Sequence, residues 1–127
     1  MNIGLDIDGT ITEMPEFFAL LSKVMRQAGH KIFIISYRDM EVLDASRAEV
    51  NSLGVEYDAM YHPGPHESLE DFKARMASQL ELDMIFDDMP ESFMKMHPNV
   101  KRFWLVDPKI YNMRSILNVL QSGILNY

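Results

Sequence analysis

The strongest constraint on the fold is that short apolar runs alternate with longer stretches of helical periodicity along the chain. Apolar runs of this length indicate buried strands, and helices that connect them in turn produce a sheet in which all strands are parallel. Five runs are predicted to be strands: 3–5, 31–35, 57–61, 84–86 and 103–106. The third is the weakest and is predicted to lie at an edge. The sequence therefore predicts an α/β fold of three layers with a five-stranded parallel sheet.

The stretches between these runs are predicted to be helices, each with one apolar face. Residues 16–28 form the first, which ends before Gly29, a residue favoured just past a helix C-terminus. Others are predicted over 39–54, from Ser68 to about residue 80, over 90–96 and from Ile110 onward. The residues expected to face the core in the first and last helices are Phe17, Leu20, Leu21, Val24, Ile110, Met113, Leu117, Leu120 and Ile124. The last helix is expected to close the fold.

Length and composition fit a single domain spanning 1–127. The chain has 127 residues, of which 47% are hydrophobic and 24% charged, which suits one core. No apolar run approaches the ~20 residues that cross a bilayer, and the first strand begins at once, so no membrane association and a cytoplasmic location are expected. A net charge of -7 and a pI near 4.9 argue against non-specific binding to nucleic acid. The lack of cysteine excludes thiolate metal sites.

Two carboxylates lie one residue apart in the segment Asp6-Ile7-Asp8-Gly9-Thr10, directly after the first predicted strand. Side chains alternate along a strand, so Asp6 and Asp8 can point the same way, and Gly9 allows the backbone to turn sharply. Two carboxylates about 4 Å apart repel each other by roughly 4 kcal/mol at an effective dielectric constant of about 20. This segment therefore favours a bound cation, a proton, or both.

Further polar groups are predicted at the same edge of the sheet. Ser36 follows the second strand, and Asp87 and Asp88 follow the fourth. The carboxyl ends of parallel strands meet at one edge, where the reactive loops of such folds gather. The helix that connects the third and fourth strands begins at that edge. Lys73, early in this helix, can therefore reach inward and neutralise the carboxylates or their ligand.

These residues resemble the four motifs of the haloacid dehalogenase superfamily of phosphohydrolases, in the same order along the chain. The corresponding residues are the DxDGT segment 6–10, Ser36, Lys73 and the acidic pair Asp87-Asp88. The resemblance implies the strand order 3-2-1-4-5. Members of this superfamily often insert a cap domain between the first and second motifs or between the second and third, but here those connections are short. A small member with an open site and no large cap is therefore expected.

The resemblance also implies a mechanism and a cofactor. Asp6 would attack phosphorus and form an aspartyl-phosphate, while Asp8 would protonate the departing oxygen and later accept a proton from the attacking water. Mg²⁺ would bind Asp6, the backbone carbonyl of Asp8, and Asp87, with Asp88 as the second choice for the ligand from the acidic pair. The expected activity is that of a Mg²⁺-dependent phosphatase acting on phosphate monoesters.

The substrate is expected to be a small phosphorylated molecule held at the same edge. Ser36 and Lys73 would bind the non-transferring phosphate oxygens, because the transition state spreads charge over these atoms. Tyr37 and Arg38, just beyond Ser36, are candidates for contact with the leaving group. No sequence pattern predicts an oligomeric state.

Two other classes of protein share part of this pattern. A signalling receiver domain has a similar length and also gathers acids and a lysine at one edge, for which Asp58 and Lys109 are available. The receiver pattern, however, has adjacent acids after the first strand, whereas Asp6 and Asp8 are separated. The second alternative is a module of the dehalogenase fold that binds Mg²⁺ or phosphate without turnover.

Overall fold

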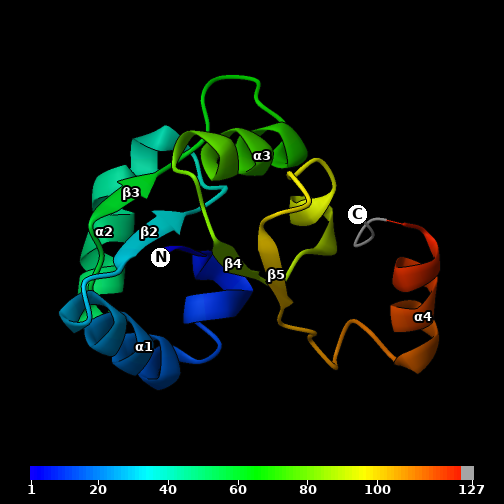
Figure 1. Cartoon of the computed structure of the whole chain (residues 1–127), viewed down its shortest axis with the longest axis horizontal. Helices are drawn as coiled ribbons and strands as arrows, with labels where there is room; N and C mark the ends of the chain where they lie inside the picture. Colours follow the sequence, from blue (N-terminus) through cyan, green and yellow to red (C-terminus); the bar gives the residue numbers. More distant parts are fainter. Residues whose placement is uncertain (124–127) are drawn as a thin grey trace.

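The apolar runs form the strands of one sheet. In the computed structural model, which describes residues 1–123, all strands pair in parallel and lie in the order β3-β2-β1-β4-β5 (Figure 1). The strands are β1 (Asn2–Leu5), β2 (Lys31–Ile35), β3 (Ala59–Tyr61), β4 (Met84–Asp87) and β5 (Lys101–Trp104). The predicted fold class and strand order are confirmed, and β3 lies at an edge as predicted.

The strand β5 begins and ends two residues earlier than the predicted run 103–106. Its neighbour β4 ends at Asp87, whose carbonyl accepts a hydrogen bond from the N–H of Leu105 at 2.9 Å. Beyond this bond β4 offers no further residue for pairing, so the apolar residues Leu105 and Val106 continue past the strand.

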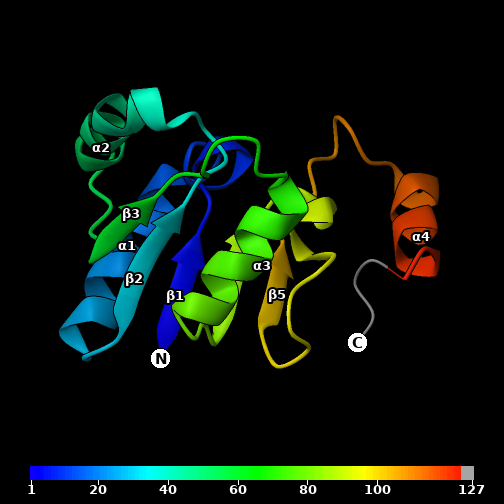
Figure 2. The same ribbon diagram turned by 90° about the horizontal axis from the view of Figure 1, so that it is seen from above.

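Helices cover both faces of the sheet, which gives three layers (Figure 2). One face is covered by α1 (Pro15–Gln27) and α2 (Leu43–Ser52), and the other by α3 (Leu69–Gln79) with the 3-10 turn η3 (Pro90–Phe93). The remaining elements are the turns η1 (Ile7–Ile11) and η2 (Met40–Val42) and the last helix α4 (Met113–Gln121).

The core is divided between the two faces because side chains alternate along each strand. On β2, Ile32 and Ile34 belong to the cluster beneath α1 and α2, whereas Phe33 and Ile35 belong to the cluster beneath α3. Phe72 of α3 is fully buried in the second cluster. The sheet thus forms the floor of both cores, and its carboxyl edge is left for polar side chains.

The buried face of α1 differs from the predicted one. Phe18 and Ser22 are buried, and Leu21 packs partly against the core. The other predicted residues of this face, Phe17, Leu20 and Val24, are exposed. The Oγ atom of Ser22 accepts a hydrogen bond from the N–H of Glu56 at 3.0 Å. A polar side chain therefore lies on the inner face of α1, so the spacing of apolar residues alone does not identify this face.

The last helix does not cover the sheet, contrary to prediction. Figure 1 shows α4 beyond β5 at the end of an extended connection, and none of its residues is buried. The predicted inner residues are 45% to 70% exposed: Ile110, Met113, Leu117 and Leu120. Ile124, the fifth of them, lies outside the described residues. The connection turns where the N–H of Tyr111 donates to the carbonyl of Asp107 at 2.9 Å, and the Tyr111 ring packs edge-on against Trp104.

The connections next to the carboxyl edge of the sheet, where the site residues are predicted, are short. Residues 12–14 separate η1 from α1, and residues 62–68 separate β3 from α3.

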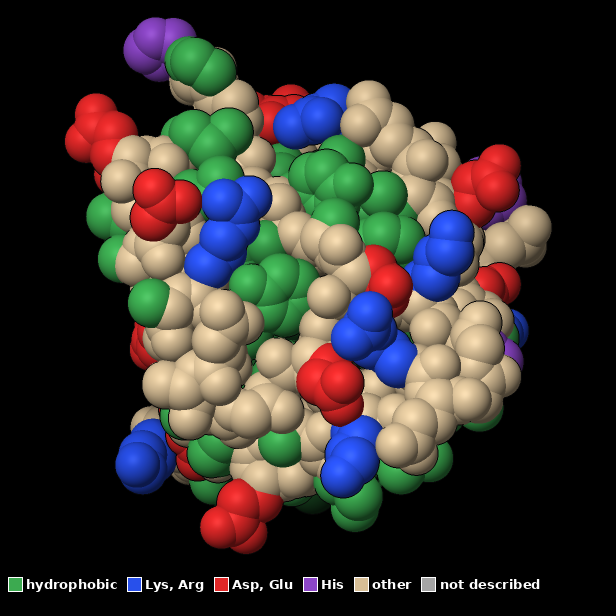
Figure 3. All heavy atoms as spheres, turned by 90° about the vertical axis from the view of Figure 1, so that its left-hand side faces the viewer, with side chains coloured by type: hydrophobic (Ala, Val, Ile, Leu, Met, Phe, Trp, Pro, Cys, Tyr) green, Lys and Arg blue, Asp and Glu red, His purple; other side chains and the backbone are tan. Residues whose placement is uncertain are grey.

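On the side of the molecule with α1, α2 and β3, acidic and basic side chains are interspersed, without a broad basic patch (Figure 3). Ion pairs on these elements include Arg26 with Asp58 and Arg47 with Asp44, each at 3.3 Å. Within residues 1–123, no helix has the length and apolar character needed to cross a membrane.

Candidate active site

The register of β1 and β4 brings three carboxylates together. Leu5 pairs with Phe86, and the N–H of Asp6 donates to the carbonyl of Phe86 at 3.1 Å. Asp6 and Asp87 therefore leave neighbouring strands at the same edge, and Asp88 follows directly. One oxygen of each of these three side chains lies within 4.8 Å of the others. We refer to Asp6, Asp87 and Asp88 as the acidic cluster.

The acidic cluster has the chemistry of a site for a hard divalent cation. All its donors are carboxylate oxygens, which Mg²⁺ prefers, and the partial exposure of Asp88 leaves room for the waters that this ion retains. Asp6 and Asp87 are buried, at 7% and 1% exposure, so their charges need compensation from within the protein or from an ion. The side chain of Asp8 is not part of the cluster, and the ligand expected from this residue is its backbone carbonyl.

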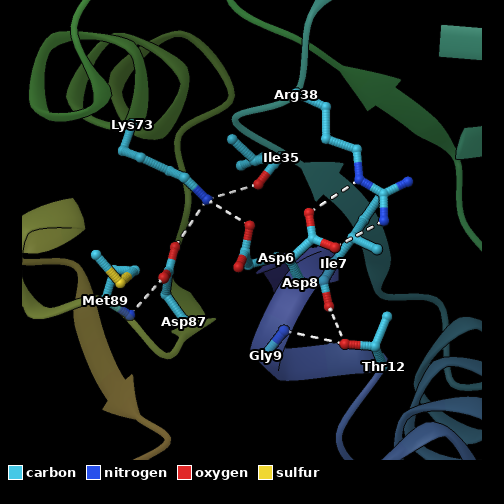
Figure 4. Close-up of polar contacts among 10 residues, drawn as sticks. All are labelled: Asp6, Ile7, Asp8, Gly9, Thr12, Ile35, Arg38, Lys73, Asp87 and Met89. Carbon is cyan, nitrogen blue, oxygen red and sulfur yellow. Dashed lines mark hydrogen bonds and ion pairs between the residues drawn. The ribbon is translucent and has the colours of Figure 1, made fainter. Parts of the chain in front are cut away.

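Lys73 supplies positive charge next to the acidic cluster (Figure 4). Its helix α3 begins at the site edge, where the side chain of Ser68 accepts a hydrogen bond from the N–H of Asp71 at 3.1 Å. From there the fully buried Nζ atom of Lys73 donates to Asp6 at 3.0 Å and to Asp87 at 2.7 Å. Its third bond, 2.7 Å, goes to the carbonyl of Ile35. The ammonium group thus spans the ends of three neighbouring strands.

Burial and charge shift the pKa values of this group in opposite directions. Burial raises the pKa of Asp6 to about 8. Lys73 lowers this pKa, whereas repulsion from Asp87 and Asp88 raises it further. Burial and the neighbouring Asp87 also raise the pKa of Asp88. For Lys73, burial favours the neutral form, but Asp6 and Asp87 outweigh it and hold the pKa above its ordinary value. The lysine is therefore charged, and the acidic cluster holds carboxylates that favour a proton or a cation.

Gly9 allows the backbone of η1 to pass close to Asp88. Its φ of 75° lies in the left-handed region, which is strained for any residue with a Cβ. A Cβ built at this position would lie 2.5 Å from Cγ of Asp88 and closer still to its Oδ2. The N–H of Gly9 donates to Oγ1 of Thr12 at 3.0 Å, which fixes the turn. The glycine is thus required both by the backbone conformation and by the position of the carboxylate.

The side chain of Asp8 points away from the acidic cluster toward Arg38 (Figure 4). The guanidinium donates to both carboxylate oxygens, at 2.9 and 2.8 Å, and this pairing lowers the pKa of Asp8. Arg38 also donates to Ser46 at 3.1 Å and to Glu49 at 2.7 Å, both on α2. Arg38, a predicted candidate for contact with the leaving group, thus contacts the residue predicted to be the acid and base.

A hollow of about 300 Å³ lies over the acidic cluster, and Tyr37, Lys73 and Ser92 are among the residues that line it. The Tyr37 hydroxyl donates to the carbonyl of Glu67 at 2.6 Å, so the ring forms a fixed wall. Ser36 does not line this hollow. Its hydroxyl is fully buried and, like those of Thr10 and Ser92, has no hydrogen-bond partner among the described residues.

Three parts of this site were missed in the sequence. Ser46 and Glu49 anchor Arg38, and their spacing of three residues on the predicted helix 39–54 places them on one face, which is a usable signal. Ser92 lies two residues after Pro90 in η3, and a lone serine there gives no signal. The N–H of Met89, which donates to Oδ1 of Asp87 at 2.9 Å, is a backbone contact that no residue type reveals.

Asp58, the residue available to a receiver domain, lies away from the acidic cluster. It directly precedes β3, whereas the acidic cluster follows β1 and β4, so it belongs to the opposite edge of the parallel sheet. Its carboxylate accepts hydrogen bonds from the N–H of Ile32 at 2.8 Å and from Arg26 at 3.3 Å. These contacts give Asp58 a structural role at the start of β2 and β3.

Comparisons with known proteins add no relative. No protein-family model, no curated protein and no solved structure matches this chain.

Proposed function

We propose that this protein is a Mg²⁺-dependent phosphohydrolase of the haloacid dehalogenase type, which hydrolyses small phosphate monoesters through an aspartyl-phosphate on Asp6. The observation that carries the proposal is the acidic cluster with the Nζ atom of Lys73 at 3.0 Å from Asp6 and 2.7 Å from Asp87. A structural ion pair would need one acid for one lysine. Here three acids from two strands lie together, and two of them pair with one lysine, at the edge where parallel sheets bind ligands.

The two aspartates of the first motif divide the chemistry. Asp6, at the base of the hollow, is the nucleophile: its carboxylate oxygen forms a bond to phosphorus as the bond from phosphorus to the leaving oxygen breaks. Asp8, at the rim, transfers a proton to that oxygen and later takes one from the water that cleaves the aspartyl-phosphate. Mg²⁺ held by Asp6 and Asp87, with Asp88 beside them, would neutralise charge on the phosphoryl oxygens.

Lys73 binds the phosphate and orients the nucleophile. The three donors of its ammonium group are already used by Asp6, Asp87 and Ile35, so a phosphate oxygen replaces one of these acceptors. Ser36 is proposed to offer its unpaired hydroxyl to the same phosphate, which requires the surrounding side chains to move, because this hydroxyl is fully buried and lies outside the lining of the hollow.

The leaving group has room beside Tyr37. This side chain lines both the hollow over the acidic cluster and a second hollow of about 530 Å³, which is bounded by the loop 63–67. No cap covers the site from residues 12–14 or 62–68, so a small ester can reach Asp6 directly.

The test is phosphate release from p-nitrophenyl phosphate and from a panel of sugar phosphates, nucleotides and pyrophosphate, with and without Mg²⁺. We expect Mg²⁺-dependent turnover that Asp6→Asn reduces by roughly 10³-fold or more. The matched control is Asp83→Asn at the opposite end of β4, where the side chain only accepts a hydrogen bond from the N–H of Asn2. This variant should keep full activity.

Other results would favour the alternatives. Turnover that survives Asp6→Asn contradicts the mechanism. Stable labelling by acetyl phosphate without release from any ester favours a phosphorylated signalling domain, and binding of Mg²⁺ without either reaction favours a non-catalytic module.

A further inference from the structure

An apolar groove of about 410 Å³ runs between α1 and the strands β4 and β5. Its floor is a series of aromatic rings in which Phe18 meets Phe86 edge-on at 5.5 Å and Phe86 stacks on Phe103 at 4.6 Å. Phe17 and Phe103, at the two sides of the groove, are 46% and 43% exposed. Within residues 1–123, no helix covers this part of the sheet.

The helix α4 carries an apolar stripe that is exposed within residues 1–123. Met113, Leu117 and Leu120 are spaced for one helical face, and all three are exposed. The opposite face carries Arg114 and Asn118. The helix is well formed at its start, where Asn112 accepts a hydrogen bond from the N–H of Ser115 at 2.9 Å. The chain therefore presents both an open groove and an unpartnered amphipathic helix.

The connection between β5 and α4 directs this helix away from its own groove. Phe103 faces the groove, and Trp104, the next residue, borders it but also packs against the cluster beneath α3. Tyr111 packs against this Trp104 ring with centroids 5.3 Å apart. The turn at Asp107 is closed by its side chain, which accepts a hydrogen bond from the N–H of Lys109 at 2.8 Å. Figures 1 and 2 both show α4 beyond the edge of β5.

We propose that the groove receives α4 from a second copy of this chain, and that two copies exchange this helix reciprocally. Each chain has one groove and one helix, so two chains satisfy all four surfaces in a closed, two-fold arrangement. The exposed Leu20 and Val24 continue the apolar surface along α1 from Phe17, which extends the area available to the partner helix.

The distribution of charge supports this occupant. The chain has 19 acidic residues and a net charge of -7, so two copies carry a net electrostatic repulsion. Neither the groove lining nor α4 contains an acidic residue. The basic residue of α4 is Arg114, and the guanidinium of Arg102, at the border of the groove, donates to the carbonyls of Met96 and Val100. Depletion of like charge at the centre of a contact is typical of protein interfaces. These two surfaces are therefore suited to contact between copies.

The first test is the mass of the protein in solution, measured by light scattering and sedimentation over a range of concentrations. We expect a dimer, and we expect Leu117→Asp to raise its Kd by about tenfold or more. Asn118→Asp adds the same charge on the polar face of α4 and should leave the dimer intact. Phe103→Asp, on the groove side, should dissociate the dimer in the same way, with the circular dichroism spectrum checking that each variant is folded.

The second test shows which chain supplies the helix. Since the protein has no cysteine, Leu117→Cys and Phe17→Cys can be made as single variants, one with an affinity tag, and mixed with a short bis-maleimide. A tagged-to-untagged product supports exchange. Two results of the first test would overturn the proposal: a monomer at all concentrations, or a dimer that Leu117→Asp leaves unaffected. In the second test, a variant that carries both cysteines would overturn it if the cross-link formed only within one chain.

Discussion

Arg38 and Asp8 are joined by two parallel hydrogen bonds, from Nε to Oδ2 at 2.9 Å and from Nη2 to Oδ1 at 2.8 Å. Paired geometry of this kind is strong and directional. The arginine is itself fixed by Glu49 at 2.7 Å, so the position of Asp8 is set through α2 as well as by its own loop. The ion pair stabilises the carboxylate form of the residue proposed to exchange protons with the substrate.

Arg38→Gln should therefore change the pH dependence of the reaction. Loss of the guanidinium raises the pKa of Asp8 toward its ordinary value, because the hydrogen bonds from Arg38 are the main cause of its lowering. The acidic limb of the kcat profile for p-nitrophenyl phosphate, which reports the hydrolysis step where Asp8 must be a carboxylate to act as base, should then move to higher pH. Arg47→Gln, which affects only a pairing with Asp44 on α2, should leave the profile in place. An unchanged profile in Arg38→Gln would mean that Asp8 does not limit the reaction at low pH.

Lys73→Met should destabilise the protein strongly. The substitution keeps much of the side-chain volume but leaves the buried Asp6 and Asp87 without their counter-charge, a change that costs about 3–5 kcal/mol in buried ion pairs. Urea unfolding measures the free energy, and added Mg²⁺ should restore part of it by binding to the acidic cluster. Lys95→Met breaks an exposed pair with Asp71 and should have little effect. Equal effects from the two variants would contradict the assignment.

Gly9→Ala should weaken Mg²⁺ binding beyond its effect on stability. The positive φ alone costs roughly 1–2 kcal/mol, and the new Cβ also collides with the carboxylate of Asp88. Gly29→Ala is a matched control, because Gly29 also has a positive φ but no atom within 4 Å of the added Cβ.

Binding can be followed by the fluorescence of Trp104, the single tryptophan, whose Nε1 donates to the carbonyl of Asp88 at 3.0 Å. Gly29→Ala should lose stability and retain the wild-type affinity for Mg²⁺. If both glycine variants bind Mg²⁺ alike, Asp88 does not contribute to the ion site.

The raised pKa of Asp6 predicts opposite effects of pH on stability and on Mg²⁺ binding. Without Mg²⁺, the folded protein keeps a proton on Asp6 until its pKa of about 8, whereas the unfolded chain loses it near the ordinary value of 3.8. This contribution to the free energy of unfolding is full below the lower value and is lost as pH rises through the higher one. Affinity for Mg²⁺ should rise over the same range, because the ion requires the carboxylate.

Unfolding by urea in EDTA, and titration with Mg²⁺ across this pH range, measure the two effects. Asp6→Asn cannot titrate and should lack this component in both measurements. A wild-type stability that increases from neutral to mildly alkaline pH would contradict the raised pKa.

Sequence patterns predicted the sheet because most strands contain a short apolar run, such as Ile32 to Ile35, that is buried between two layers. The convergence of Asp6, Asp87 and Lys73 also followed from topology, since residues after parallel strands and at the start of the intervening helix meet at one edge. The partners of Arg38 were not predicted, because they depend on how α2 is placed above the site.

Helix faces were predicted less well, for a physical reason. An apolar stripe shows that a helix can bury one side, but it does not say which surface lies opposite. In α1 the inner face includes the buried Ser22, and in α4 the stripe of Leu117 and Leu120 is exposed in the part of the chain that the structure describes. Both errors concern contacts made outside the helix itself.

The bridge from Lys73 to Asp6 and Asp87 has a consequence for how the protein matures. An internal ammonium group already balances the two innermost acids, so the chain can reach its native conformation before any metal arrives. Folding and the proposed binding of Mg²⁺ would then be separate events, unlike in small metalloproteins whose polypeptide is unfolded without the ion. On the proposed function, the protein would gain and release Mg²⁺ without losing its fold.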